Sequence, residues 1–115
     1  MTKRVLIVED DRALRESIVQ LLELEGFEPI PTGTLTQARR SIRASFRGVV
    51  LSDIQMPDHD GFDVLRLAQS RDPDLPVVLL TGHSDVSTAM RAMKSGAYDY
   101  LEKPCNPDRL LETLG

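Results

Sequence analysis

Polar groups that can bind a metal ion or a phosphoryl group follow four short apolar runs of this 115-residue chain. The runs and the groups behind them are 5–8 with Glu9, Asp10 and Asp11, 49–51 with Ser52 and Asp53, 77–80 with Thr81, and 98–101 with Glu102 and Lys103. Open α/β sheets place their sites at the carboxyl ends of parallel strands. If the runs are neighbouring parallel strands, we therefore expect these groups to share one pocket.

The carboxylates of Glu9, Asp10 and Asp53 need a counter-ion if they converge. Unit charges ~4 Å apart repel by about 4 kcal/mol at an effective dielectric constant of 20. Glu9, Asp10 and Asp53 offer only oxygen ligands, with no histidine or cysteine in the run. Such a donor set suits a hard cation that keeps several waters, so we expect Mg²⁺, with Mn²⁺ as an alternative, and disfavour zinc.

A carboxylate beside a divalent cation, a lysine and a hydroxyl is equipped to receive a phosphoryl group. The carboxylate oxygen attacks phosphorus in line, while the positive charges offset the charge on the equatorial oxygens. We assign Asp53 as the nucleophile, Lys103 as the positive charge and Thr81 as the hydroxyl donor. Glu9 and Asp10 are then left to hold the metal.

The apolar runs alternate with longer amphipathic stretches, a pattern typical of βα units that feed a parallel sheet. Five such units can be counted, and the second strand is expected at 27–30. Pro29 lies inside this strand and cannot donate to a ladder, which favours a sheet edge. Right-handed crossovers then predict an α/β fold of the flavodoxin-like (βα)5 type, with strand order 2-1-3-4-5 and helices on both faces.

Helix boundaries and helix faces can also be read from the sequence. Thr34 and Gln37 have the spacing of a capping box, and Pro107 stands at a favoured first helical position. Met90 and Met93 repeat at helical spacing, and we interpret them as core residues. The prediction is one domain that spans residues 1–115.

Composition excludes several classes of protein. Hydrophobic residues make up 41% of the chain and charged residues 28%, and the net charge is -4, so we expect a globular domain that does not bind nucleic acid directly. The first apolar run, 5–8, is too short for a signal peptide or a membrane span. Cys105 is the single cysteine, which excludes an internal disulfide and predicts a reducing, cytoplasmic location.

Several short motifs together resemble the receiver domain of two-component response regulators, in order and spacing along the full chain. They are Glu9-Asp10, Ser52-Asp53-Ile54-Gln55-Met56-Pro57, Asp60-Gly61, Thr81-Gly82 and Lys103-Pro104. Each motif is weak alone, but the combination is specific. The amino-acid sequences of 81–85 and 96–100 are most similar to those of the receivers of enhancer-binding transcriptional activators.

The resemblance implies a role for each site residue. Asp53 would accept phosphate from a sensor histidine kinase, Asp10 would be a direct metal ligand, and Glu9 would act mostly through water. The backbone carbonyl of Gln55 would be a further ligand. Tyr100 matches the aromatic residue whose rotamer reports activation, and its inward turn would change the surface of the fourth helix, fifth strand and fifth helix. A homodimer on phosphorylation is the expectation for that surface.

The family likeness also predicts a cis bond between Lys103 and Pro104. Cys105 departs from the family, in which a phenylalanine usually follows the Lys-Pro pair, so we expect the packing of the last helix to differ from that in relatives. Gln55 and His83 occupy the positions that tune acyl-phosphate hydrolysis in this family. We hypothesise that this pair sets the lifetime of the phosphorylated state.

Three other functions compete with this interpretation. A hydrolase of the haloacid dehalogenase type needs a second acid two residues after the nucleophile, where this chain has Gln55. A flavodoxin-like cofactor-binding module needs a phosphate-cradling loop after the first strand, where this chain has acids. A pseudo-receiver would lack part of the set Asp53, Thr81 and Lys103. The short last helix predicts a domain cut from a longer regulator with a C-terminal effector domain, rather than a free-standing receiver.

Overall fold

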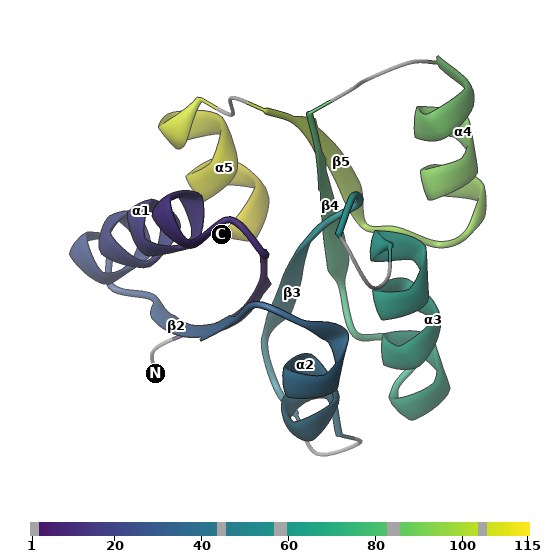
Figure 1. Cartoon of the computed structure of the whole chain (residues 1–115), viewed down its shortest axis with the longest axis horizontal. Coiled ribbons are helices and arrows are strands. Elements are labelled where there is room, and N and C mark those ends of the chain that lie inside the picture. The colour runs from purple at the N-terminus through teal and green to yellow at the C-terminus, as the bar shows by residue number, and fades with distance from the viewer. Residues whose placement is uncertain (1–2, 44–45, 57–59, 83–85, 104–105) are drawn as a thin grey trace.

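The computed structural model describes residues 3–43, 46–56, 60–82, 86–103 and 106–115, and they form a five-stranded parallel sheet with the order β2-β1-β3-β4-β5 (Figure 1). The strands are β1 (Arg4–Val8), β2 (Glu28–Thr32), β3 (Val49–Asp53), β4 (Val77–Thr81) and β5 (Asp99–Glu102). The helices are α1 (Arg12–Leu24), α2 (Leu35–Ser41), α3 (Gly61–Arg71), α4 (Val86–Lys94) and α5 (Pro107–Leu114). This order confirms the predicted α/β fold.

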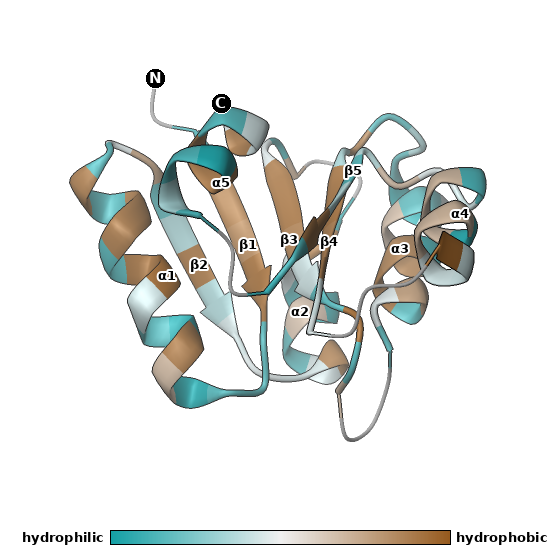
Figure 2. Cartoon of the chain, turned by 90° about the horizontal axis from the view of Figure 1, so that it is seen from above, coloured by the Kyte–Doolittle hydropathy of each residue, from teal (hydrophilic) through white to brown (hydrophobic). Residues whose placement is uncertain are grey.

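Helices cover both faces of the sheet, with α1 and α5 on one side and α2, α3 and α4 on the other (Figure 1). Alternate residues of a strand point to opposite faces. Val5 and Ile7 accordingly pack in the apolar cluster that contains residues of α1 and α5, and Leu6 and Val8 pack in the cluster of α2, α3 and α4. In Figure 2 the strands β1, β3 and β4 are brown along most of their length, which fits burial on both faces.

The edge position of β2 confirms the prediction made from its proline, but the strand begins later than expected. The amide of Phe27 donates to the carbonyl of Leu22 at 2.9 Å and so helps to close α1. Gly26 adopts a φ of 84° at this closure, which is a conformation that favours glycine. The strand therefore starts at Glu28, after the helix end has used the preceding amide.

The N-termini of α2 and α5 are capped as the sequence predicts, with one difference. Thr34 Oγ1 accepts from the amide of Gln37 at 3.1 Å, whereas the Gln37 side chain accepts from the amide of Gly33 at 2.7 Å instead of closing a capping box on Thr34. Asn106 caps α5, and Pro107 occupies its first turn.

The interpretation of Met90 and Met93 as core residues is wrong. Their exposed fractions are 51% and 52%, and the residue of α4 that is buried is Ala92. Two stripes on this helix follow helical spacing, and the small side chain of Ala92 lies on the one that packs toward the sheet. The longer side chains of Met90 and Met93 lie on the other stripe. The prediction failed because helical spacing alone does not say which stripe faces inward.

Within the described part of the chain, none of the helices combines the length and the apolar character that crossing a bilayer requires.

Candidate functional site

Glu9 and Asp10 follow β1 at the carboxyl edge of the sheet. The Glu9 backbone is held at both ends, because its amide donates to the carbonyl of Thr32 at 3.0 Å and its carbonyl accepts from Arg15 Nη1 at 2.7 Å. Glu9 is 1% exposed, while Asp10 is exposed. The edge therefore presents one buried and one open carboxylate.

Asp53 ends β3, which lies between β1 and β4 at the centre of the sheet. The residue is 5% exposed. One of its carboxylate oxygens, Oδ1, accepts from the amide of Gln55 at 3.3 Å. The segment behind it is fixed as well, since the amide of Ile54 donates to the carbonyl of Leu80 at 2.8 Å.

Lys103 joins the two buried acids. Its Nζ lies 2.7 Å from Glu9 Oε1 and 3.0 Å from Asp53 Oδ2. The amide of Lys103 donates to the carbonyl of Thr81 at 2.7 Å, so the end of β4 positions the lysine. Residues 94 positions apart in the sequence thus form one ion-paired group.

Burial and the ion pairs shift the protonation of this group. Burial raises the pKa of Glu9 from 4.5 to about 7, although the hydrogen bond from Lys103 opposes that rise. For Lys103, burial lowers the pKa, but the hydrogen bonds and charges of Glu9 and Asp53 outweigh burial, and the pKa rises above its usual 10.5. The lysine therefore stays charged at neutral pH, while Glu9 exchanges its proton near pH 7.

The acids also meet the requirements of a cation site. Ligand oxygens of Glu9, Asp10 and Asp53 all lie within 4.8 Å of one another. Glu9 Oε2 is buried and has no hydrogen-bond partner among the described residues. A buried carboxylate oxygen without a partner is costly, and a bound hard cation would satisfy it. The donor chemistry of these residues therefore fits a divalent metal ion.

Comparison with known families identifies the domain. Residues 5–115 match the response regulator receiver domain. The chain belongs to this family. As a receiver domain it is a phosphorylation-activated switch of two-component systems rather than a classical enzyme, and this membership sets aside the hydrolase and the flavodoxin-like interpretations.

Curated relatives of the receiver domain are transcriptional regulators. The chain is 43% identical over 95% of its length to the C4-dicarboxylate transport transcriptional regulatory protein DctD of Rhizobium meliloti (strain 1021) and 46% identical over 96% to DctD of Pseudomonas aeruginosa. It spans 24% of the length of each of these relatives.

Solved structures support the same family. The beryllofluoride-activated NtrC4 receiver domain dimer is 40% identical, with a TM-score of 0.91, and the alignment covers 98% of this chain and 93% of that one. The CheY-like receiver domain protein from Methanospirillum hungatei JF-1 is 35% identical, with a TM-score of 0.89, over 97% of this chain and 90% of that one.

The remaining predicted site residues differ in their burial and in the elements that carry them. Thr81 is buried at the end of β4. Tyr100 is half-buried on β5 and packs against the cluster that contains residues of α3 and α4. Gln55 has an exposed side chain. His83, together with Pro104 and Cys105, lies outside the described residues.

Sequence reasoning missed residues that hold the site in place. Arg15 anchors the carbonyl of Glu9, and Thr32 Oγ1 donates to the carbonyl of Ile7 at 2.7 Å, which ties the edge strand to β1. Ser52, for which the sequence predicts no role beside Asp53, donates through Oγ to the carbonyl of Asp53 at 3.0 Å. The roles of Arg15 and Thr32 could not be predicted from the sequence, because both side chains donate to backbone carbonyls of another segment. Such a contact leaves no pattern of residue types in the sequence.

Proposed function

We propose that this receiver domain is switched when Asp53 accepts a phosphoryl group from a sensor histidine kinase in a Mg²⁺-dependent reaction. The observation that carries the proposal is the position of Lys103 Nζ, 3.0 Å from Asp53 Oδ2 and 2.7 Å from Glu9 Oε1. A cation that touches both acids can offset the negative charge of the Asp53 carboxylate and of a phosphoryl group that approaches it as the electrophile.

In the proposed reaction, an Asp53 carboxylate oxygen forms a bond to phosphorus as the bond between phosphorus and the donor histidine nitrogen breaks. Lys103 offsets charge on the transferring group, and the Thr81 hydroxyl donates to one of its oxygens. Glu9, Asp10, Asp53 and the backbone carbonyl of Gln55 would hold Mg²⁺, or Mn²⁺ in its place. The bound ion would neutralise part of the charge on the phosphoryl oxygens.

The test is labelling with acetyl phosphate or a cognate kinase in Mg²⁺. We expect Asp53→Asn to abolish incorporation, because an amide oxygen is a far poorer nucleophile than a carboxylate. Asp11→Asn is the matched control, since Asp11 is exposed and accepts from the amide of Leu14 as the cap of α1, a role that asparagine also fills. Full labelling of Asp53→Asn would show another acceptor.

Phosphorylation would add about -1.5 to -2 charges beside the cluster. The new oxygens would draw Thr81 toward them and let Tyr100 turn further inward, which changes the surface of α4, β5 and α5 by population shift. Gln55 and His83 would set the rate at which the acyl phosphate hydrolyses. Unchanged dephosphorylation in a Gln55→Ala, His83→Ala double variant would contradict the assignment of this pair.

The partners in this proposal are a sensor histidine kinase and a C-terminal effector domain that controls transcription. The names of the relatives support such an output, as does the small share of their length that this chain matches. A cytoplasmic location, predicted from the single cysteine, belongs to the same proposal. Direct binding of this domain to nucleic acid is not part of it, given the net charge of -4.

A further inference from the structure

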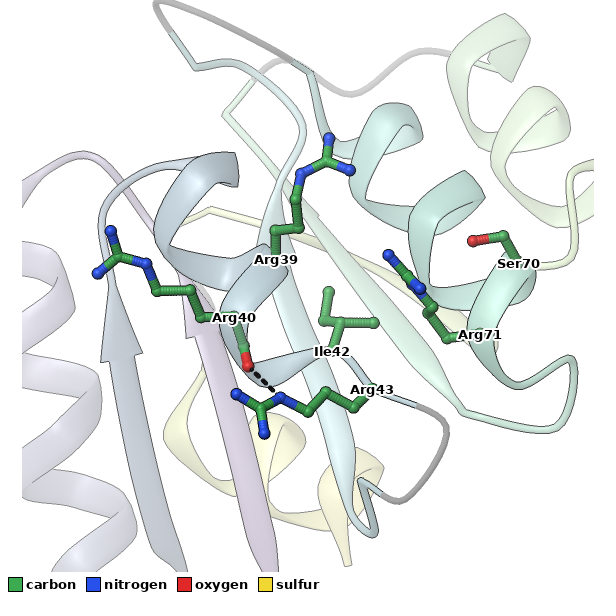
Figure 3. Close-up of a pocket in the computed structure, with 6 residues that line it drawn as sticks. All are labelled: Arg39, Arg40, Ile42, Arg43, Ser70 and Arg71. Atoms are coloured by element: carbon green, nitrogen blue, oxygen red, sulfur yellow. Dashed lines mark hydrogen bonds between the residues drawn. The ribbon is translucent and has the colours of Figure 1, made fainter.

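Four arginines surround one open pocket between the ends of α2 and α3, away from the acid cluster. The pocket has a volume of about 590 Å³ and is lined by Arg39, Arg40, Ile42, Arg43, Ser70 and Arg71 (Figure 3). Both helices end here before the chain enters β3 and β4 at the amino ends of those strands, whereas Asp53 lies at the carboxyl end of β3. The pocket therefore does not overlap the phosphoacceptor site.

The arginines of this pocket differ from others on the domain in their partners. Arg4, Arg12 and Arg66 each form an ion pair with a carboxylate. Across the described ranges, no ion pair is found for the four pocket arginines, and the Arg43 Nε donates to the backbone carbonyl of Arg40 at 2.8 Å. Among the residues that the structure describes, none that lines the pocket is acidic.

A basic residue in the last turn of a helix is common, because it complements the helix dipole. That effect accounts for Arg71 on α3 or for one arginine on α2, taken singly. It does not account for four guanidinium groups around one hollow in a chain whose net charge is -4. The concentration of positive charge is local and runs against the charge of the whole domain.

The arrangement of the side chains suits a ligand with more than one anionic group. In Figure 3, Arg71 reaches from α3 toward α2, with Arg39 on the facing part of α2, while Arg40 on α2 and Arg43, which follows the helix, point to its other side. Guanidinium groups bind phosphate oxygens through paired hydrogen bonds. Cations spread over two helices can therefore contact separate phosphates of one molecule.

The volume and the lining of this open pocket suit a small ligand. Its volume of about 590 Å³ falls within the range of ligand pockets, roughly 300 to 1,000 Å³. Ile42, which is 1% exposed, gives it an apolar lining beside the cations, and Ser70 adds a hydroxyl group. We propose that this pocket binds a small anion with two or more phosphate groups, either an inorganic polyphosphate or a nucleotide.

Calorimetric titration of the domain in metal-free buffer at physiological salt tests this site, with tripolyphosphate and ATP as probes. We expect saturable binding of tripolyphosphate and an Arg39→Gln, Arg71→Gln variant that weakens it by about tenfold for each guanidinium lost. Backbone amide NMR shifts during the titration should centre on Ile42 and Ser70. Tighter binding of ATP than of tripolyphosphate would identify a nucleotide, and equal binding would identify an inorganic chain.

The control variant, Arg12→Gln with Arg66→Gln, removes the same charge from ion-paired positions outside the pocket. It should change the affinity for tripolyphosphate by less than about twofold. An equal loss in both variants would overturn the proposal in favour of general charge attraction, and so would binding that does not saturate. Preference for a polyglutamate peptide over both phosphate probes would also overturn it, because the pocket would then dock an acidic protein segment.

Discussion

At the scale of single residues, the site depends on how one ammonium group is shared between two buried acids. Lys103 contacts one oxygen of Glu9 and one of Asp53. The second oxygen of Asp53 accepts from the backbone of Gln55, whereas the second oxygen of Glu9 has no partner in the described part of the chain. Burial raises the pKa of Glu9, and the single hydrogen bond from Lys103 only partly opposes that rise.

The raised pKa of Glu9 makes metal-free stability depend on pH. The folded state holds the proton up to about pH 7 and the unfolded state only to about 4.5. The stability contributed by the neutral carboxyl is thus complete below pH 4.5 and is lost as pH rises to about 7. We expect this loss to approach about 3 kcal/mol.

Urea unfolding without metal at pH 5 and pH 8 measures this effect. Other carboxylates titrate too, so the informative quantity is the difference between the wild type and Glu9→Gln, which stays neutral throughout. The wild type should lose more stability than the variant over this interval. Parallel pH profiles for the two proteins would show that Glu9 is ionised at both pH values.

Replacing Lys103 with methionine keeps the apolar stem but removes the shared charge. We expect Lys103→Met to lower the free energy of unfolding by about 2 kcal/mol at pH 8, since the buried carboxylates of Glu9 and Asp53 each lose a charged hydrogen-bond partner. The loss should shrink at pH 5, where Glu9 is protonated. Denaturant unfolding gives both values, and Lys94→Met on the exposed part of α4 is the control, with little change at either pH.

At the scale of elements, the sequence specifies the strand ends better than the helix faces. A buried parallel strand is a continuous apolar run, so its carboxyl end can be located to within one residue from the first polar residue, which is Ser52 in β3 and Thr81 in β4. The convergence of the acids with Lys103 then follows from strand order. The face of α4 does not follow, because burial of Ala92 rather than Met90 depends on how closely the helix approaches the sheet.

The first residue of α3, Gly61, packs so closely against the end of β3 that there is no room for a side chain. A Cβ atom added to Gly61 would lie 2.7 Å from the Asp53 carbonyl oxygen and 2.9 Å from Ile54 Cα. Both are backbone atoms that cannot move alone. We expect Gly61→Ala to cost about 1 to 3 kcal/mol of stability through overpacking, and to weaken metal binding because the Asp53 end of β3 must shift.

Chemical denaturation and Mg²⁺ titration of Gly61→Ala test this expectation. Gly82→Ala is the matched control, since a Cβ there meets no atom of the described residues within 4 Å. The control should differ from the wild type by less than about 0.5 kcal/mol. A Gly61→Ala protein as stable as the control would mean that the start of α3 can move away from β3 at little cost.

At the scale of the whole molecule, metal binding should stabilise the fold that assembles the site. In the unfolded chain the metal ligands are far apart and do not form a site. Mg²⁺ at about 100 times its dissociation constant therefore adds about 2.7 kcal/mol to the free energy of unfolding. We expect Asp10→Asn to remove most of this gain at the same Mg²⁺ concentration, while Asp74→Asn, an exposed acid outside the cluster, retains it. Thermal unfolding with and without Mg²⁺ measures the gain, and an equal gain in both variants would place the metal elsewhere.

Exposed apolar side chains gather on one side of the domain. Of the five exposed large hydrophobic residues described, four lie on α4 or next to β5, namely Val86 at 76%, Met90 at 51%, Met93 at 52% and Tyr98 at 62%. These residues lie on the surface of α4 and β5, which the proposed inward turn of Tyr100 would change on activation. The related NtrC4 receiver domain is a dimer when activated by beryllofluoride. We therefore expect activation to promote self-association of this domain through α4 and β5.

A charge placed within this apolar surface should prevent that association without affecting phosphorylation. Met90→Glu should weaken the dimer formed in beryllofluoride and Mg²⁺ by about tenfold or more, since a buried unpaired carboxylate costs over 1.4 kcal/mol. Leu24→Glu is the control, because Leu24 is 84% exposed but lies at the end of α1. Sedimentation velocity with and without beryllofluoride distinguishes the two, and a dimer that survives Met90→Glu but not Leu24→Glu would move the interface to α1.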